Sequence, residues 1–134
     1  MMYLKDIKEW LKPQIKEATF YIGKIDNSKE KVIGLYNRAS SNNKIAVGGL
    51  ENTSTANKRI CLLVHWNQNC DTSEKIAKSI YNLFYGKRAT IAGCRCFFNM
   101  INDEPVPTGT DDNNVYEFTI DIEIIYERNE EQWQ

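Results

Sequence analysis

One run of residues near the carboxyl end constrains the fold of this chain more than any other feature. Between residues 115 and 126, apolar and polar side chains alternate almost without a break. Successive side chains of a β-strand point to opposite faces, so the pattern predicts a strand with one apolar and one acidic face. At about 3.3 Å per residue, this strand is roughly 40 Å long. The apolar face has Tyr116, Phe118, Ile120, Ile122, Ile124 and Tyr126, and the other face has Glu117, Thr119, Asp121, Glu123 and Glu127.

Two segments have the spacing of amphipathic helices. Residues 1–13 carry apolar side chains at helical intervals. Pro13 should end or kink this helix near Lys12, because proline lacks an N–H and disfavours helix in the residue before it. A second, central helix is predicted to begin at Asp71, because Asp71 and Glu74 have the spacing of a capping box. Gly86 is placed to stop this helix.

Other segments have the composition of strands. Residues 18–25 and 31–37 are separated by a polar turn at 26–29, and together they predict a hairpin. Residues 58–66 are largely apolar on both faces, which predicts a central strand covered on both sides. Residues 90–101 predict another strand or a hairpin.

Two long polar segments separate these elements. Residues 39–57 and 102–114 are predicted to be loops, the first with room for a short strand at 45–47. The order of helix, strands, helix and strands predicts an α+β fold, in which an N-terminal helix and one central helix pack on a mostly antiparallel mixed sheet. We expect a single domain over residues 1–128 and a frayed tail at 129–134.

Composition excludes several classes of function. The 134 residues suit one domain, which can bury roughly 65–70% of its unfolded surface without metal or disulfide support. The net charge of −1 and the scattered basic residues argue against direct nucleic-acid binding. No apolar run approaches the roughly 20 residues that span a bilayer, and the amphipathic amino terminus is unlike a signal peptide. The four cysteines lack C-x-x-C spacing, so we expect reduced thiols in a cytoplasm.

The sequence offers little for catalysis. Its single histidine, His65, lies in an apolar strand, where a nucleophilic couple would need Ser54, Cys61 or Cys70. Cys61 is four residues away on the same strand face, about 13 Å distant. We therefore predict a half-buried, hydrogen-bonded sheet histidine and no enzymatic activity.

Two further motifs favour structural readings. Cys94 and Cys96 should lie together on the core face of a strand; they would help to bind a metal only if Cys61 and His65 came close. The Gly48-Gly49 pair lacks the context of a phosphate-binding loop and predicts a tight bend.

Acidic residues in the last third of the chain have more than one reading. The pair Asp111-Asp112 predicts an Asx-type turn that starts the last strand, rather than a metal loop. The row of Glu117, Asp121 and Glu123 is either a solvated sheet face or a subunit interface. At an interface, this row would meet basic residues of a neighbouring copy, for which the candidates are Lys58, Arg59, Lys87 and Arg88. Composition does not decide between the solvated face and the interface.

Several blocks, in order along the chain, resemble a phage family labelled minor capsid protein. This family is similar to the tail terminators, or tail-completion proteins, of long-tailed phages and phage-tail-like particles. The blocks are residues 21–26, 48–54, 60–67, 104–113, 116–117 and 126–128.

The resemblance implies an α+β protomer that forms a ring, typically a hexamer, on the end of a finished tail tube. The ring would end tube polymerisation and join the tail to the connector or sheath; a head-completion, neck or minor capsid protein is the alternative. The implied partners are copies of the chain, the tail tube protein and a sheath or head–tail connector protein, first in the host cytoplasm and then in the particle. No catalytic, cofactor-binding or metal-binding residue carries over. The expected interface residues are Gly48, Gly49, Glu51, Asn52, Lys58, Arg59, Thr110, Asp111, Asp112, Glu117, Asp121 and Glu123.

Overall fold

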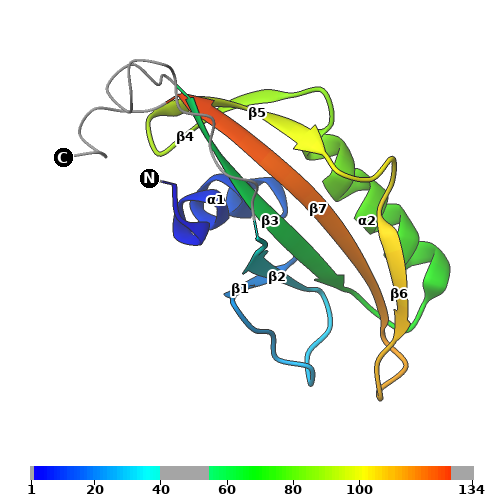
Figure 1. Ribbon diagram of the computed structural model, residues 1–134. Helices are drawn as coiled ribbons and strands as arrows, with labels where there is room; N and C mark the ends of the chain where they lie inside the picture. Colours follow the sequence, from blue (N-terminus) through cyan, green and yellow to red (C-terminus); the bar gives the residue numbers. More distant parts are fainter. Residues whose placement is uncertain (1, 40–54, 128–134) are drawn as a thin grey trace.

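The structure is a computed structural model that describes residues 2–39 and 55–127, and Figure 1 shows its helices against one long, twisted sheet. The helical segments are α1 (Leu4–Leu11), the short 3-10 helix η1 (Lys12–Gln14) and α2 (Cys70–Phe84). The strands are β1 (Thr19–Ile22), β2 (Val32–Asn37), β3 (Thr55–His65), β4 (Arg88–Ile91), β5 (Cys94–Met100), β6 (Val106–Thr110) and β7 (Tyr116–Glu127).

The predicted α+β class is confirmed. In the described part of the chain the sheet has seven strands in the order β1-β2-β3-β7-β5-β4, and β6 also pairs with β7. Every pair is antiparallel except β1 with β2. The sheet is therefore mixed and mostly antiparallel, as the sequence predicts.

Strand β7 is the long strand predicted from the alternating pattern. One of its edges pairs with β3 from Glu117 to Glu127, whereas its other edge is shared by β5 near one end and β6 near the other. Its apolar side chains from Phe118 to Ile124, at every second residue, and Tyr126 belong to the core, and its acidic side chains lie on the opposite face together with Ile125. The alternation of side chains in the sequence thus corresponds to a strand with one face toward the core.

Both α-helices cover the core face. The Trp10 ring of α1 lies 5.4 Å from the Phe84 ring of α2 and 5.4 Å from the Phe98 ring of β5, measured between centroids. Phe84 and Phe98 meet edge to face at 5.0 Å. These contacts place both helices on the same face of the sheet. β3 is central, as predicted, and the described helices cover one of its faces. On its other face, Cys61 and His65 are buried.

The central helix begins two residues earlier than predicted. Asn69, not Asp71, is the N-cap, because the Asn69 side chain accepts a hydrogen bond of 3.0 Å from the backbone N–H of Thr72. Asp71 instead forms an i,i+4 ion pair of 3.0 Å with Lys75. The helix ends before Gly86 as predicted, and Gly86 has a positive φ of 68° that favours glycine at this position.

The predicted hairpin of β1 and β2 is wrong. The two strands are parallel, with Thr19 opposite Val32 and Ile22 opposite Leu35. The connection must therefore return along the sheet to begin β2 beside the start of β1. It comes close to the sheet at Gly34, where a Cβ atom would lie only 2.6 Å from Ile25 Cγ2. A side chain at position 34 would obstruct this return.

Two predicted loops contain strand. Residues 106–110 of the expected loop at 102–114 form β6, whose side chains are all exposed. Because no apolar face is buried, β6 has no alternating pattern to read, and Pro107 and Gly109 flank an irregularity in its pairing. Likewise, β3 begins at Thr55, within the expected loop at 39–57. The short strand predicted at 45–47, the bend at Gly48-Gly49 and the tail at 129–134 lie outside the described residues.

Candidate functional site

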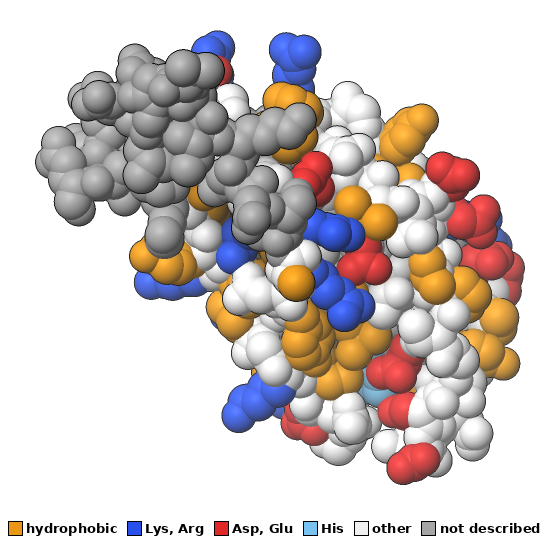
Figure 2. Space-filling model, viewed as in Figure 1, with side chains coloured by type: hydrophobic (Ala, Val, Ile, Leu, Met, Phe, Trp, Pro, Cys, Tyr) orange, Lys and Arg blue, Asp and Glu red, His pale blue; other side chains and the backbone are white. Residues whose placement is uncertain are grey.

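The sheet face away from the helices, here called the outer face, carries the charged residues of β3 and β7. Register sets its membership, because Arg59, Cys61 and His65 of β3 lie opposite Glu123, Asp121 and Glu117 of β7. Figure 2 shows acidic and basic side chains beside apolar ones on this side of the molecule, with the chain's single histidine next to acidic groups. The outer face is therefore neither purely polar nor purely apolar.

The acidic row of β7 has partners within its own chain. Arg38 Nε donates to Asp121 Oδ1 at 3.0 Å, and Arg38 Nη2 lies 3.4 Å from Cys61 Sγ. Glu123 accepts from Asn57 Nδ2 at 2.9 Å and from Asn99 Nδ2 at 3.3 Å. These contacts relieve the repulsion that carboxylates in one row would otherwise experience.

The electrostatics of these contacts follow from burial and hydrogen bonding. The hydrogen bond to Asp121 raises the pKa of Arg38, so the guanidinium stays charged. Burial, followed by the nearby Asp121 charge, raises the pKa of the Cys61 thiol. Cys61 therefore lacks the lowered pKa that activates a nucleophilic cysteine.

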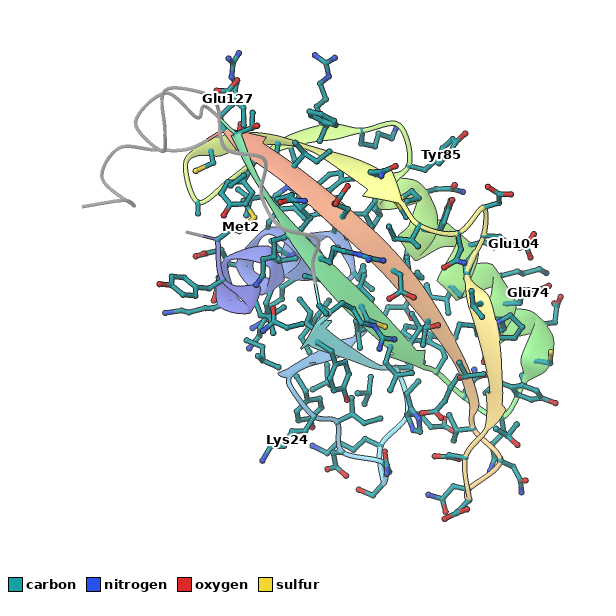
Figure 3. All side chains as sticks on the ribbon, in the orientation of Figure 1. Met2, Lys24, Glu74, Tyr85, Glu104 and Glu127 are labelled. Carbon is teal, nitrogen blue, oxygen red and sulfur yellow. The ribbon has the colours of Figure 1, made fainter. Side chains whose placement is uncertain are left out.

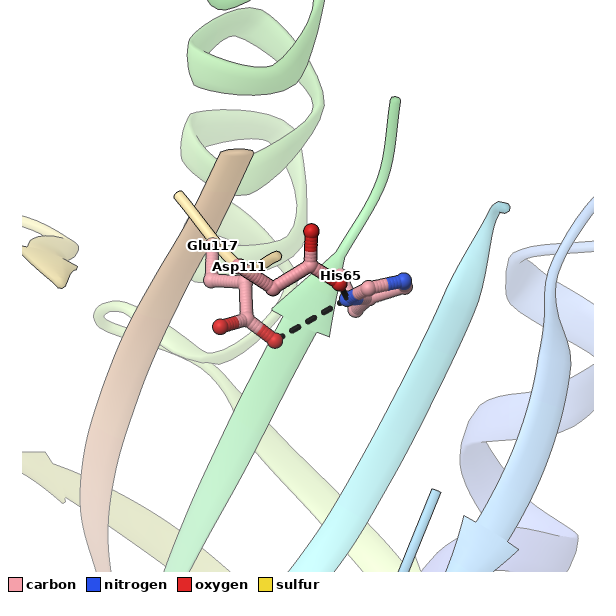
Figure 4. A group of neighbouring side chains, drawn as sticks. All are labelled: His65, Asp111 and Glu117. Atoms are coloured by element: carbon pink, nitrogen blue, oxygen red, sulfur yellow. Dashed lines mark hydrogen bonds and ion pairs between the residues drawn. The ribbon is translucent and has the colours of Figure 1, made fainter. Parts of the chain in front are cut away.

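The most unusual cluster on the outer face joins His65, Asp111 and Glu117, shown in Figure 4. His65 Nδ1 lies 2.9 Å from Glu117 Oε2 and 3.6 Å from Asp111 Oδ2. The His65 side chain is completely buried, and the two carboxyl side chains are only 15% and 20% exposed. A buried imidazole thus faces two largely buried carboxylates.

Local structure positions each member of this cluster. Pairing of β3 with β7 sets His65 directly across from Glu117. Asp111 lies in the turn that leads into β7, where its Oδ1 atom accepts hydrogen bonds of 2.9 Å from the backbone N–H groups of Asn113 and Val115. The predicted Asx-type turn is thereby confirmed. With Oδ1 committed to the turn, Oδ2 of the same carboxylate is turned toward the histidine.

Two atoms of the cluster lack hydrogen bonds. Asp111 Oδ2 and His65 Nε2 are both buried without a partner among the described residues. In the same part of the chain, no lysine or arginine forms an ion pair with Asp111 or Glu117. A buried carboxylate oxygen without a donor is destabilising, so the cluster has an unmet need for positive charge or a donor.

The prediction for His65 is correct in kind but not in degree, because the side chain is fully buried rather than half-buried. The idea that Cys94 and Cys96 could join Cys61 and His65 around a metal is wrong. Cys94 and Cys96 belong to the core cluster beneath the sheet, whereas Cys61 and His65 lie on the outer face. Burial, followed by the charge of Cys94, raises the pKa of Cys96 to about 11.

The sequence alone did not bring His65 together with its two acidic neighbours. The sequence assigns Asp111 to an Asx-type turn and Glu117 to a solvated face or an interface, and it links neither to His65, since 52 residues separate His65 from Glu117 along the chain. The usable signal is the pairing of two alternating strands, which sets residues at the end of one beside residues at the start of the other. That signal requires the register, which only the structure supplies.

The remaining interface candidates are spread over the molecule. Lys58 points to the core side of β3, where Nζ donates to Asn37 Oδ1 at 2.6 Å and burial lowers its pKa. Thr110 and Asp112 are exposed at the β6–β7 turn, and Arg59 is half-buried on the outer face. Gly48, Gly49, Glu51 and Asn52, like Ser54, lie outside the described residues. Their role in an interface stays a prediction.

Apolar groups are exposed at several positions around the sheet. The side-chain view in Figure 3 places Tyr85 beyond the end of α2 and Glu127 at the far end of β7. Near Glu127, a hollow of about 500 Å³ is lined by residues of β3, β4, β5 and β7, including Phe97, which is 49% exposed. No helix in the described ranges has the length and apolar character needed to cross a membrane.

Comparison with known proteins adds one match. A family model described as bacteriophage tail terminator protein matches residues 3–128, which is nearly the whole chain. A search of curated proteins and a search of solved structures each found no match.

Proposed function

We propose, from the premise that this chain belongs to the bacteriophage tail terminator protein family, that it caps the end of a phage tail tube as a ring of identical subunits. Membership of this family gives the protein a structural role in phage tail assembly. The proposal extends that role to a closed ring, because a cap must match every subunit of the tube end at once. Six subunits is the stoichiometry we propose.

The family match carries the proposal, and the outer face, which no described helix covers, supports it. The described helices leave this face without a covering layer, although it presents Leu63, Phe97 and Ile125 beside charged groups. Mixed apolar and charged surfaces of this kind suit protein contacts, because apolar groups supply affinity and charges set the orientation. We propose that this face and its margins contact neighbouring subunits or the tube.

The two edges of the sheet provide a second means of association. In the described chain, β1 pairs only with β2 and β4 pairs only with β5, so each has an edge without a strand partner. Such edges can pair with a strand from another subunit. A ring requires two different surfaces on each copy, and the opposite edges of one sheet provide them.

The β6–β7 turn is a further contact surface in the proposal. Thr110 and Asp112 are exposed there, and the turn projects from one end of the molecule in Figure 1. The tail tube protein, and a sheath or head–tail connector protein, are the proposed partners of the ring. The proposed location is the host cytoplasm during assembly and then the head-proximal end of the tail, with no enzymatic activity.

Removal of the gene from a phage or tail-like particle tests the capping role. Without a cap, tube subunits continue to add, so electron microscopy should show tails of variable and increased length. Labelled protein should be found at the head-proximal tail end of wild-type particles. Label on the capsid shell, or tails of normal length without heads, would replace the terminator role with that of a capsid or neck protein.

A pair of surface variants tests the outer face. Phe97→Ser removes an aromatic ring that is 49% exposed on this face, whereas Tyr3→Ser removes one that is 62% exposed at the start of α1. Both should leave thermal unfolding nearly unchanged, because neither ring is buried. We expect only Phe97→Ser to reduce ring formation in sedimentation velocity. Equal assembly by the two variants would exclude this face from the contacts.

A further inference from the structure

We propose that His65, Asp111 and Glu117 form a binding site for one divalent transition-metal ion of the Zn²⁺ type. The ion would join the end of β3 to the β6–β7 turn and to the start of β7. The role is structural: the ion holds the projecting turn against the sheet. This inference is independent of ring formation and adds a ligand to the proposed function.

The distances between the ligand atoms fit a small metal ion. Tetrahedral Zn²⁺ with bonds of about 2.0–2.2 Å holds neighbouring ligand atoms about 3.3–3.5 Å apart. The distances from His65 Nδ1 are 2.9 Å to Glu117 Oε2 and 3.6 Å to Asp111 Oδ2, and all three ligand atoms lie within 4.8 Å of one another. Both distances from His65 Nδ1 therefore differ from the spacing around Zn²⁺ by only a few tenths of an ångström.

The charge of the cluster favours a divalent ion. Two ionised carboxylates carry two negative charges, and a divalent ion neutralises both. In the described chain no lysine or arginine forms an ion pair with either carboxylate, so no side chain supplies the missing charge in this way. Because these groups are largely buried, water screens the surplus charge poorly.

The ligands are held in place before any ion binds. The two backbone hydrogen bonds to Asp111 Oδ1 fix its carboxylate and leave Oδ2, buried and without a hydrogen-bond partner among the described residues, directed at the site. His65 is locked by complete burial in a central strand. Fixed ligands of this kind raise metal affinity, because little conformational freedom is lost on binding. Imidazole together with carboxylate ligands suits Zn²⁺ and its neighbours better than Ca²⁺ or Mg²⁺.

Isothermal titration of the full chain with ZnCl₂, after EDTA treatment and dialysis, tests the site. The titration uses a Cys70→Ser background, because the exposed Cys70 thiol could bind Zn²⁺ by itself. Asp111→Asn and Glu117→Gln remove a ligand charge with almost no change in shape. Asp112→Asn, an exposed neighbour in the same turn, is the matched control.

We expect one Zn²⁺ per chain in the background protein and in the Asp112→Asn variant. Binding should weaken by at least about tenfold in the Asp111→Asn and Glu117→Gln variants. Zn²⁺ should also raise the melting temperature of the background protein and of Asp112→Asn, but not that of the two ligand variants. The two ligand variants therefore provide separate tests should one of them fold poorly.

Two results would overturn the proposal. One is the absence of Zn²⁺ binding by the folded background protein up to millimolar concentration. The other is equal affinity in the background protein and both ligand variants, which would place the ion elsewhere. Neither result bears on tail length or ring formation, so failure of the metal site is distinguishable from failure of the capping role.

Discussion

The parallel arrangement of β1 and β2 depends on a close approach between the returning connection and Gly34, and Gly34→Ala tests this contact. A Cβ atom at position 34 would lie 2.6 Å from Ile25 Cγ2 and 2.8 Å from Tyr36 Cε2. Carbon atoms in ordinary contact are about 3.5–4.0 Å apart, so the new methyl group overlaps both neighbours by about 1 Å. Either Ile25 or Tyr36, or the strand itself, must move.

The size of the effect follows from two opposing contributions. Overpacking of a buried site costs about 1–3 kcal/mol, and Gly34 is buried within β2. Replacement of glycine by alanine in an ordinary backbone conformation recovers about 0.4–1 kcal/mol, because the unfolded chain loses freedom. Gly34 is not among the positive-φ residues, so this second contribution applies. We expect Gly34→Ala to reduce the free energy of unfolding by about 1–2 kcal/mol.

Urea denaturation in two backgrounds identifies the cause. Ile25→Ala removes the nearest of the obstructing atoms, so Gly34→Ala should cost less in that background than in the wild type. The difference should be about 0.5 kcal/mol or more, as is usual for residues in contact. A hairpin, by contrast, would not require Ile25 to lie over Gly34. A variant as stable as the wild type, or equal losses in both backgrounds, would refute the parallel packing described above.

Four further outcomes follow from the structure. Asn69→Ala should destabilise α2 by about 1 kcal/mol through loss of its N-cap, whereas Asp71→Ala should cost less than about 0.5 kcal/mol, as measured by urea denaturation. Phe84→Ala should cost about 3–5 kcal/mol by calorimetry, because the ring is fully buried between two other aromatic rings. Of the four thiols, only Cys70 should react quickly with a disulfide reagent at neutral pH, and four should react in denaturant. Burial raises the pKa of Cys96 in the folded protein to about 11, so the thiol ionises at lower pH in the unfolded chain than in the folded one. Cys96 should therefore lower the stability of the fold as pH rises from about 9 toward 11. In urea denaturation across this pH range, Cys96→Ala should lose less stability than the wild type.

Zn²⁺ bound by His65, Asp111 and Glu117 would restrain the β6–β7 turn. The three ligands come from a strand end, a turn and a second strand, so an ion would tie the projecting turn to the centre of the sheet. A rigid turn loses less freedom when it meets a partner than a loose one does. The stability measurements and the assembly measurements remain separate, because each has its own control variant.

Elements with a strong local period could be predicted from sequence. The alternation in β7 required a half-buried strand, and every apolar side chain that it assigned to the core from Phe118 to Tyr126 is buried. The helical spacing after Asp71 predicted α2, although the cap was placed two residues late because Asn69 caps as well as an aspartate does. Such regular spacing of apolar residues can be recognised in a sequence, because burial of one side of a helix or strand requires apolar residues at fixed intervals.

Strand direction and strand existence were harder to predict. Residues 18–37 have the composition of a hairpin, yet direction depends on where the chain returns, and Gly34 permits a return across the sheet. Strand β6 is fully exposed, so its sequence carries no alternation, and it is a strand only because the free half of one β7 edge accepts it. In both cases the deciding contact lies far away in the chain.

The amino-acid sequence by itself determined the α+β class, the long two-faced strand, the central helix, and the resemblance to tail terminators that the family match bears out. Only the tertiary structure decided that His65, Asp111 and Glu117 meet, that the cysteines of β5 lie on the opposite face from His65, and that β1 runs parallel to β2. The physical reason is that burial of one face selects apolar residues at regular intervals along a segment, so the interval can be recognised in the sequence. Register and strand order depend instead on pairings between distant segments, whose backbone hydrogen bonds are nearly the same for every sequence.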